Sequence, residues 1–284
     1  VLFRSPDHSF TILESRPVSG GTWDLFRYPG IRSDSDMYTY SYGFKPWRDK
    51  STIADGHKIL NYIREAATEY GIDPHIRYRH KVIAANWSSA DKRWLVTAER
   101  GDSGEHVTID CKFVFNCTGY YDYEQGYTPE FDGIGDFKGR VFHAQHWPEE
   151  LDYKGKQVIV VGSGATAVTL VPTMSKDTNS LVMLQRTPTY IANVPSEDPM
   201  AQSLRKWLPL SWTFRLTRWK KVLFQIYIYK LSRKRPQELR KFLLGEVRQA
   251  PGPDYDVETH FTPPYNPWDQ RLCAVPGGDM FDAI

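Results

Sequence analysis

Residues 157–186 read QVIVVGSGATAVTLVPTMSKDTNSLVMLQR, and this stretch decides the fold that we predict for the chain. The run QVIVV indicates a fully buried strand, the glycines after it a tight turn, AVTLVPTM a helix and LVMLQ the next strand. Strand, glycine turn, helix and strand in this order are typical of a parallel α/β unit. We therefore predict an α/β fold.

The turn of this unit has the spacing G-x-G-x-x-A of a dinucleotide-binding loop. The first glycine permits the tight turn, the second lets the backbone approach a pyrophosphate, and the small third residue lets the helix pack on the strand. The helix N-terminus supplies N–H donors and a favourable dipole. The alternative is a plain glycine-rich turn. The residues predicted to bind the dinucleotide are Gly162, Ser163, Gly164, Ala165, Thr166, Ala167 and Val168.

The end of the second strand indicates which dinucleotide binds. An NAD site has an acid about 20 residues after the glycines, where it holds the ribose hydroxyls. Here the strand is followed by Arg186 and Thr187, and no acid is present. A guanidinium and a hydroxyl suit a 2′-phosphate, so we predict NADPH. The alternative for Arg186 is a surface arginine at a strand end.

The first residues of the chain suggest a second nucleotide site. Ser9–Glu14 predicts a strand, and a carboxylate at the tip of a parallel strand is typical of a ribose-binding acid. No glycine precedes this strand in the sequence. Glu14 is therefore either an ordinary surface acid or the end of a unit whose first strand and glycine loop have been cut away. We favour truncation.

Periodicity and breaker residues predict the remaining elements. We expect a helix over His57–Tyr70, a hairpin of strands Lys81–Trp87 and Trp94–Ala98, a strand pair over Val107–Cys117, helices over Trp207–Gln249 with a break at Pro236, and an irregular stretch over Pro251–Pro267.

Composition excludes several classes of protein. The 284 residues have 40% apolar and 25% charged residues, which is ordinary for a globular chain and excludes global disorder, collagen and coiled coil. Three cysteines without a C-x-x-C motif exclude a disulfide framework and a zinc site, so we predict a reducing, cytoplasmic setting. His143 and His146 have the H-x-x-H spacing, but no third ligand lies nearby, so we predict no metal.

Three further motifs carry a resemblance to a known family. They are E-x-R-x-x-x-G-G-T-W from Glu14, R-Y-P-G-x-R-x-D from Arg27, and F-x-G-x-x-x-H-x-x-x-W-P from Phe137. The first two resemble the FAD domain of Baeyer–Villiger monooxygenases, and the third matches the fingerprint of that family. The chain is similar to the family from about Pro6 to its end. It resembles most the ethionamide-activating branch, through GGTWDLFRYPGIRSDSDMYT and YNPWDQRLC.

The resemblance implies two Rossmann-like dinucleotide-binding domains, for FAD and NADP, with a helical insertion in the NADP domain. Residues 6–140 would form an FAD-binding domain without its first strand and glycine loop. Residues 141–196 would begin the NADP-binding domain, 197–262 would be the insertion, and 263–284 would return to the NADP-binding domain. The chain would then be truncated at both ends.

The resemblance also implies cofactor contacts. FAD would contact Glu14, Thr22, Trp23, Asp24, Leu25, Asp34, Tyr40 and Val82, while Arg32, Ser33 and Asp34 would also lie by the nicotinamide. Thr118 and Gly119 resemble the turn at a strand end that leads out of the FAD domain. The fingerprint residues Phe137, Gly139, His143, Trp147 and Pro148 would lie on or near the linker between the domains, where His143 and Trp147 would influence cofactor movement.

The implied catalytic residue is Arg271, with Asp34 orienting it. Oxygen insertion develops negative charge on oxygen, which a fixed cation in a dry site stabilises. Arginine suits this role because it stays charged when buried. Taken alone, Arg271 is typical of a surface salt-bridge partner, and the assignment rests on the resemblance.

The resulting prediction is an enzyme that uses FAD, NADPH and O₂ to convert a small ketone into an ester or lactone, with oxidation of a thioether as a further activity. One alternative is an N- or S-oxygenating flavin monooxygenase, which Trp147-Pro148 and the Asp34 and Arg271 pair disfavour. A flavin disulfide reductase would need a paired redox cysteine motif, which is missing. The last alternative is a fragment that binds NADPH without catalysis. We expect this chain alone to be inactive and to bind little FAD.

Charge is concentrated in one segment. Ser203–Arg248 contains 13 Lys and Arg but only Glu238 and Glu246 as acids, a local net charge of +11. Aromatic and aliphatic residues alternate with the cations. We interpret the segment as packed insertion helices with a solvated basic face, with peripheral membrane contact as the alternative. No motif for nucleic-acid recognition is present.

Overall fold

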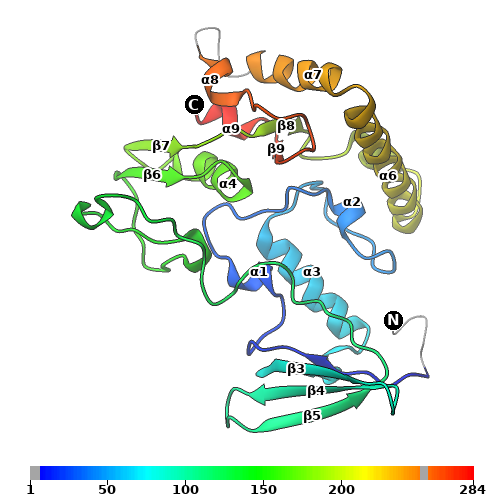
Figure 1. Ribbon diagram of the computed structural model, residues 1–284. Helices are drawn as coiled ribbons and strands as arrows, with labels where there is room; N and C mark the ends of the chain where they lie inside the picture. Colours follow the sequence, from blue (N-terminus) through cyan, green and yellow to red (C-terminus); the bar gives the residue numbers. More distant parts are fainter. Residues whose placement is uncertain (1–6, 250–254) are drawn as a thin grey trace. The chain divides into compact units, whose positions relative to one another are not determined.

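A computed structural model describes residues 7–249 and 255–284 (Figure 1). The chain divides into two units. Unit 1 contains residues 7–25 and Ile59–Asp136 of the described chain, and unit 2 contains Phe26–Lys58 and the described residues from Phe137 to Ile284. The family resemblance implies an FAD-binding domain over residues 6–140 and an insertion over residues 197–262, and all of the implied domain boundaries stay predictions. Residue 6 of the first range and residues 250–254 of the second lie outside the described residues.

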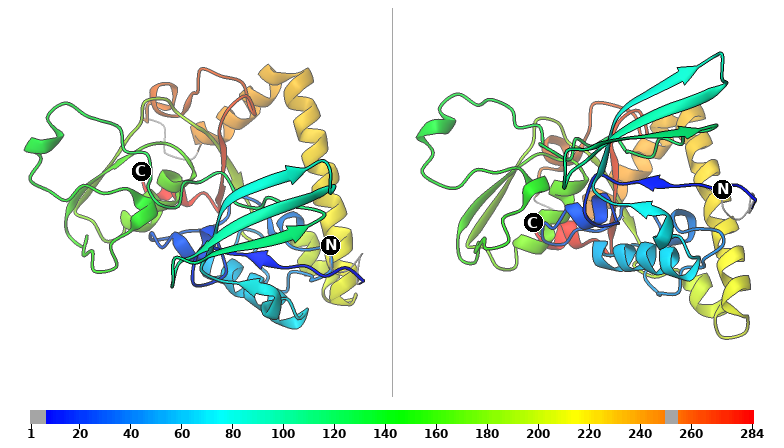
Figure 2. Two further views of the ribbon diagram at one scale, coloured as in Figure 1. Left: turned by 60° about the horizontal axis from the view of Figure 1, so that its bottom comes forward. Right: turned by 90° about the horizontal axis from the view of Figure 1, so that it is seen from below.

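Unit 1 combines a short parallel pair with an antiparallel sheet. Strand β1 (Ile12–Leu13) pairs in parallel with β2 (Ile76–Arg77). Strands β3 (His80–Ser88), β4 (Arg93–Arg100) and β5 (His106–Cys111) form the antiparallel sheet, which Figure 2 shows from two further sides in cyan to green. The short helices of this unit are α1 (Thr22–Leu25), η1 (Asp73–His75) and η2 (Ile134–Asp136). The predicted hairpin is confirmed, with Ser88 opposite Arg93.

Helix α3 (Gly56–Glu69) begins at the end of the Phe26–Lys58 segment and continues into unit 1. Its buried side chains Ile59, Tyr62 and Ala66 recur every three or four residues, which is the spacing of one helix face. The predicted helix over His57–Tyr70 is therefore confirmed, because burial follows the 3.6-residue period.

Unit 2 is built around residues 157–186, which contain the predicted glycine turn. Strand β6 (Gln157–Val161), helix α4 (Ala165–Met174) and strand β7 (Ser180–Leu184) follow each other, and the two strands pair in parallel. Strand β8 (Tyr190–Val194) pairs in parallel with β9 (Leu272–Pro276). The remaining helices are α2 (Met37–Tyr40), η3 (Ala144–His146), α5 (Pro199–Leu204), α6 (Leu210–Lys234), α7 (Pro236–Gln249), α8 (Val257–Phe261) and α9 (Asp279–Asp282).

The core of unit 2 lies between α4 and the β8–β9 pair. Val168 and Val171 of α4 belong to one buried cluster with Ile191 of β8 and Val275 of β9. Side chains from α7, α8 and α9 complete this cluster, and Val160, Leu181 and Met183 pack against it. The arrangement fixes the start of α4, because both the strand before the glycine turn and the helix after it are anchored in the same core.

Three expectations about these elements are wrong in detail. Strand β6 is not fully buried: Ile159 is 60% and Val161 57% exposed. The side chains of β6 alternate between exposed and half-buried, because one face of the β6–β7 pair packs on the core and the other is open to solvent. The irregular stretch Pro251–Pro267 contains α8, which begins where the Asp256 side chain accepts a hydrogen bond from the Thr259 N–H.

The predicted strand pair over Val107–Cys117 is a single strand, β5 (His106–Cys111). Residues 112–119 continue without strand structure, so Thr118 and Gly119 do not follow a strand end. Cys111 pairs with Trp94, and beyond it β4 gives way to the β3–β4 turn. Among the described residues, the chain after Cys111 therefore has no neighbouring strand with which to form hydrogen bonds, and Phe113 and Phe115 are left exposed.

Candidate functional site

The glycine turn of residues 162–164 joins β6 to α4 in the predicted context. Gly162 has φ +135°, a conformation that side chains disfavour, and its N–H donates to the Leu184 carbonyl at 2.8 Å. Gly164 occupies the N-cap position of α4, where no side chain caps the helix. A Cβ built on Gly162 or Gly164 would meet no described atom within 4 Å beyond the adjoining residues. The outer side of this turn is therefore open.

Ser163 ties the turn to the end of β7. Its hydroxyl donates to the Thr187 carbonyl at 2.7 Å, and the serine is buried. Arg186, one residue before, is exposed. The structure thus brings the glycine turn and the predicted 2′-phosphate residues together at one edge of the β6–β7 pair, as expected for the carboxyl ends of parallel strands.

The turn Tyr28-Pro29-Gly30 packs against α4. Gly30 has φ +72°, and a Cβ there would lie 2.1 Å from Thr173 Oγ1 and 3.2 Å from the Thr169 carbonyl oxygen. Burial raises the pKa of the Tyr28 hydroxyl above its usual value, and its hydrogen bond with the Thr166 side chain opposes part of that rise. Thr166 lies in the predicted dinucleotide loop, so the R-Y-P-G motif supports the first turn of α4.

The loop after this turn is held by an ion pair that the sequence motifs did not indicate. Both terminal nitrogens of Arg32 donate to the Asp279 carboxylate of α9, one of them at 3.1 Å. The Ser33 hydroxyl donates to the Ser35 carbonyl at 2.9 Å and is buried. Asp34 between them is exposed. The ion pair fixes the backbone that carries Asp34.

Arg271 lies at the start of β9, next to Leu272, and is exposed. It forms no ion pair with Asp34 in the described part of the chain. Both residues act on one group, however: burial raises the pKa of the Cys273 thiol to about 11, the charge of Asp34 adds to the rise, and the charge of Arg271 opposes it. Asp34 and Arg271 therefore lie within electrostatic reach of the same buried side chain, without direct contact between them.

The Gly-Gly-Thr-Trp turn of unit 1 is closed by charged side chains. Asp24 is buried and accepts from Arg16 and Arg64, each at 2.7 Å. Arg16 also donates to the Gly21 carbonyl and Arg64 to the Ser19 carbonyl, each at 3.0 Å. Two arginines and one carboxylate thus hold this turn against α3.

The other predicted FAD contacts are divided between the units. In unit 1, Glu14 Oε1 accepts from the Arg16 N–H at 2.9 Å, and the Thr22 and Tyr123 hydroxyls lie 3.0 Å apart. Glu14, Thr22, Trp23, Asp24, Leu25 and Val82 belong to unit 1, whereas Arg32, Ser33, Asp34 and Tyr40 belong to unit 2. Tyr40 and Val82 are 48% and 46% exposed, so their surfaces are open to a ligand.

The fingerprint residues surround η3. His143 caps this helix by accepting the Gln145 N–H on Nδ1 at 3.2 Å, and burial together with the nearby His146 lowers the pKa of its imidazole. Trp147 packs edge-on against Phe142 and Tyr153, with ring centroids 5.2 and 6.2 Å away. Phe137 folds over Gly139, where a Cβ would approach its ring to 2.5 Å. Pro148 follows directly. The motif therefore has a packing role in unit 2.

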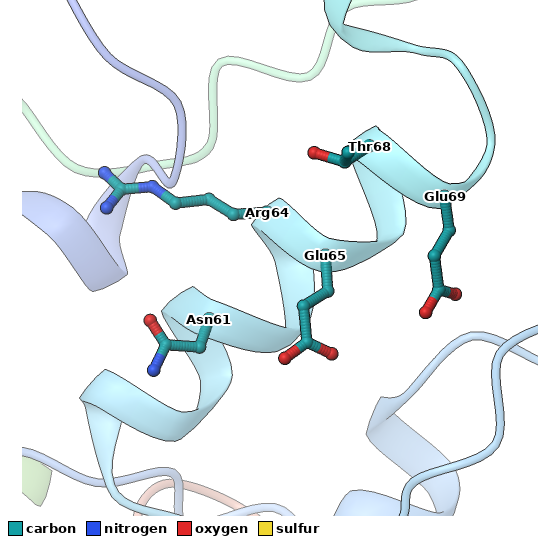
Figure 3. Close-up of a pocket in the computed structure, with 5 residues that line it drawn as sticks. All are labelled: Asn61, Arg64, Glu65, Thr68 and Glu69. Atoms are coloured by element: carbon teal, nitrogen blue, oxygen red, sulfur yellow. The ribbon is translucent and has the colours of Figure 1, made fainter.

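One surface pocket lies along helix α3 of unit 1. Asn61, Arg64, Glu65, Thr68 and Glu69 line it, all from α3, and Figure 3 shows their side chains along the helix. Arg64 of this set is the partner of Asp24. Within residues 7–249 and 255–284, no three His, Cys, Asp or Glu side chains gather as metal ligands would, and the absence of a metal stays a prediction.

Some residues of the site were missed from the sequence. Asp279 and Arg64 are distant in sequence from the groups they hold, by 247 and 40 positions, so no local pattern marks them. Arg16 stands inside the E-x-R-x-x-x-G-G-T-W motif, and its spacing to the glycines was the available signal. Tyr28 likewise stands in the R-Y-P-G motif.

Comparison with known proteins identifies a family, curated relatives and solved structures of similar fold. The family model for flavin-binding monooxygenase-like proteins matches residues 31–204. The FAD-containing monooxygenase EthA of Mycobacterium tuberculosis is 51% identical over 282 residues, which are 99% of this chain and 57% of the relative. The chain therefore spans little more than half the length of the curated relatives it matches.

Two solved structures share the fold. A crystal structure of OTEMO in complex with FAD and NADP has a TM-score of 0.76 at 22% identity, over 100% of this chain and 61% of the other. Oxidized steroid monooxygenase bound to NADP has a TM-score of 0.77 at 22% identity, over 99% and 60%. At this identity the likeness shows the mixed α/β fold.

Proposed function

The chain belongs to the flavin-binding monooxygenase-like family, and from this premise we propose that its full-length form is an FAD- and NADPH-dependent Baeyer–Villiger monooxygenase. It would insert one oxygen atom of O₂ beside the carbonyl of a small ketone and release an ester or lactone. Bound FAD would supply the activation of oxygen, and bound NADPH the reducing hydride. The EthA relative is an FAD-containing monooxygenase, which supports FAD, and the OTEMO complex with FAD and NADP supports both cofactors.

The open glycine turn at the start of α4 carries the proposal. Gly162 and Gly164 leave the space that a pyrophosphate would need, and the first N–H groups of α4 face the same end of the helix. Ser163 holds this turn beside Thr187. We propose that the loop from Gly162 to Val168 binds the pyrophosphate, and that the exposed Arg186 binds the 2′-phosphate of NADPH.

In unit 1, we propose that one carboxylate binds FAD directly and another positions neighbouring residues for it. Glu14 Oε2 accepts no hydrogen bond from the described residues, so this carboxylate oxygen fits a ribose hydroxyl. Both oxygens of Asp24 are engaged by arginines. We propose that Asp24 acts by positioning Thr22, Trp23 and Leu25 for the flavin.

Arg271 is the residue that we propose for catalysis. Its guanidinium would stabilise negative charge that develops on oxygen. Asp34 would orient it once the cofactors are bound. The Arg32 and Asp279 ion pair would keep Asp34 in place.

We further propose two Rossmann-like domains with the boundaries predicted above, with the fingerprint at their linker. The three cysteines are free, and NADPH is an intracellular reductant, which supports a cytoplasmic location.

The full-length protein tests the reaction. It would be incubated with FAD, NADPH and ¹⁸O₂ against linear, cyclic and aryl ketones and a thioether, and the products analysed by mass spectrometry. Labelled ester or lactone is expected. Arg271→Lys should abolish labelled product while NADPH binding is retained, because lysine cannot offer the same planar donor fork. Labelled ester at the wild-type rate from this variant would contradict the role of Arg271.

Two other outcomes identify the alternatives. Labelled sulfoxide without ester would assign the protein to the N- or S-oxygenating flavin monooxygenases. NADPH binding without any flavin absorbance would mean a binding module without catalysis. Arg186→Gln separates the cofactor from the reaction, since it should weaken NADPH about tenfold and leave NADH unchanged.

A further inference from the structure

Helix α6 presents an apolar stripe to solvent. Its buried side consists of Thr213, Phe214, Thr217 and Ser232. The opposite side carries exposed apolar residues spaced three or four apart, as one face of a helix requires. We call them the outer stripe: Trp212, Leu216, Trp219, Leu223, Ile226 and Tyr227. Trp219 is 65% and Leu223 60% exposed, so no described part of the chain covers this face.

Charge around the outer stripe has one sign. Residues 199–235 contain ten Lys and Arg and no Asp or Glu. Some of these cations are engaged within unit 2: Arg205 and Arg218 donate to main-chain carbonyls of residues 38–49, Lys220 and Lys221 pair with Asp198, Arg233 pairs with Asp269, and Arg235 pairs with Glu238. The cations that form no ion pair with described residues, and are exposed, are Lys206, Arg215, Lys230 and Lys234.

The unpaired cations border the apolar side chains. Helical spacing places Lys230 and Lys234 on the same line as Trp219 and Leu223, about two and three turns beyond Leu223, while Arg215 lies at its edge. Tryptophan and leucine flanked by long basic side chains are the composition of a helix that lies at a bilayer surface. The charged ends of the Lys and Arg side chains can reach lipid phosphate groups, while their aliphatic stems cover apolar surface.

We propose that the outer stripe docks this protein on the surface of a membrane that contains anionic lipids. Charge complementarity selects this occupant. Residues 199–235 carry ten cations and no acid, so two copies packed through the stripe would bring two positively charged surfaces together, which like-charge repulsion opposes. Spanning is excluded for the described residues, none of whose helices is long and apolar enough to cross a bilayer. The proposal is independent of the oxygenation reaction.

Vesicle binding of the full-length protein tests the proposal. Vesicles of phosphatidylcholine with and without phosphatidylglycerol would be sedimented with the protein, and tryptophan quenching by brominated lipid would report the depth of insertion. Binding to the anionic vesicles is expected, weakening as salt rises. Trp212→Ser with Trp219→Ser should remove the quenching, and the triple change Arg215→Gln, Lys230→Gln and Lys234→Gln should lower affinity about tenfold to hundredfold.

The matched control is Phe242→Ser with Lys241→Gln, an exposed aromatic and cation on α7. It should bind like the wild type. The proposal is overturned if the anionic vesicles do not sediment the protein, or if the control weakens binding as much as the stripe variants. A dimer in solution that Trp219→Ser dissociates would assign the stripe to a second copy instead. Far-UV circular dichroism and the urea midpoint check that the variants are folded without use of the proposed reaction, so failure of docking and failure of the reaction are distinguishable.

Discussion

The two glycine turns at the predicted nucleotide sites differ in what surrounds the missing side chain. At Gly20 a Cβ would lie 2.3 Å from the Leu60 side chain and 3.1 Å from Asp24 Cβ, so the protein itself fills the space. At Gly164 a Cβ would meet no described atom within 4 Å beyond the adjoining residues. The first glycine is required for packing, whereas the second leaves room that the fold does not use. The same residue type therefore serves a structural role in one turn and fits a ligand in the other.

Gly20→Ala gives the largest expected effect on stability. The residue has φ +123°, which is nearly restricted to glycine, and the added methyl group would overlap Leu60. We expect a loss of about 3 kcal/mol in the free energy of unfolding, measured in urea. Gly71→Ala is the control, because Gly71 also has positive φ but open surroundings, and it should cost about 1 kcal/mol. Equal losses would show that backbone conformation alone decides the first turn.

Asp24→Asn tests whether charge closes the same turn. The substitution removes the carboxylate charge of Asp24, which is buried and forms ion pairs with both Arg16 and Arg64. We expect a loss of about 2–3 kcal/mol in stability, less than for a fully buried pair because Arg64 reaches solvent. Glu124→Gln, in an exposed pair with Lys81, should leave the urea midpoint almost unchanged. An unchanged midpoint for Asp24→Asn would mean that the arginines contribute nothing to the turn.

Gly164→Ala should leave the fold intact and weaken the ligand. The φ of −82° suits alanine, so stability should fall by less than about 1 kcal/mol. The methyl group would occupy the space of the pyrophosphate, and NADPH affinity of the full-length protein should drop at least tenfold, about 1.4 kcal/mol by calorimetry. Gly245→Ala, an open glycine of α7, should bind NADPH normally. Wild-type affinity in Gly164→Ala would move the dinucleotide site elsewhere.

Tyr28→Phe has the smallest expected effect and a pH signature. Removing the hydrogen bond with Thr166 should cost about 1 kcal/mol near neutral pH. The pKa of Tyr28 is raised above 10.0 in the fold, so the unfolded chain ionises first as pH rises. The contribution of Tyr28 to the free energy of unfolding is fully present below pH 10 and is lost as the pH rises through the pKa of Tyr28 in the folded protein. Stability of the wild type should therefore fall more steeply above pH 10 than that of Tyr28→Phe, and parallel profiles would contradict this.

Local patterns predicted most elements of the fold. The α3 helix, the β3–β4 hairpin and the β6–α4–β7 unit follow from periodicity and turn residues that lie close together in sequence. Burial was less predictable: the apolar run QVIVV reads as a fully buried strand, yet three of its five side chains are exposed. Whether a face of the β6–β7 pair is buried depends on which other elements the fold packs against it, and the local sequence of a strand does not determine this.

The candidate site divides in the same way. Glycine spacing and the strand ends predicted a phosphate-binding loop from Gly162 to Val168, because the pattern of such a loop is local, and the structure shows the predicted strand, turn and helix there. The pairing of Arg32 with Asp279 was not predictable, since opposite charges 247 positions apart carry no mutual signal in a single sequence. The role predicted for Asp34 in orienting Arg271 stays a prediction, and no ion pair joins the two residues in the described part of the chain, where both side chains are exposed.

By itself, the sequence determined the α/β class, the glycine turn between β6 and α4, and the family, since each depends on residues at fixed short spacings. Only the tertiary structure decided which glycines are enclosed and which are open, which arginines hold Asp24, and that the outer face of α6 is apolar and exposed. The physical reason is that close packing and ion pairing depend on distances in space, and those are set by the whole fold.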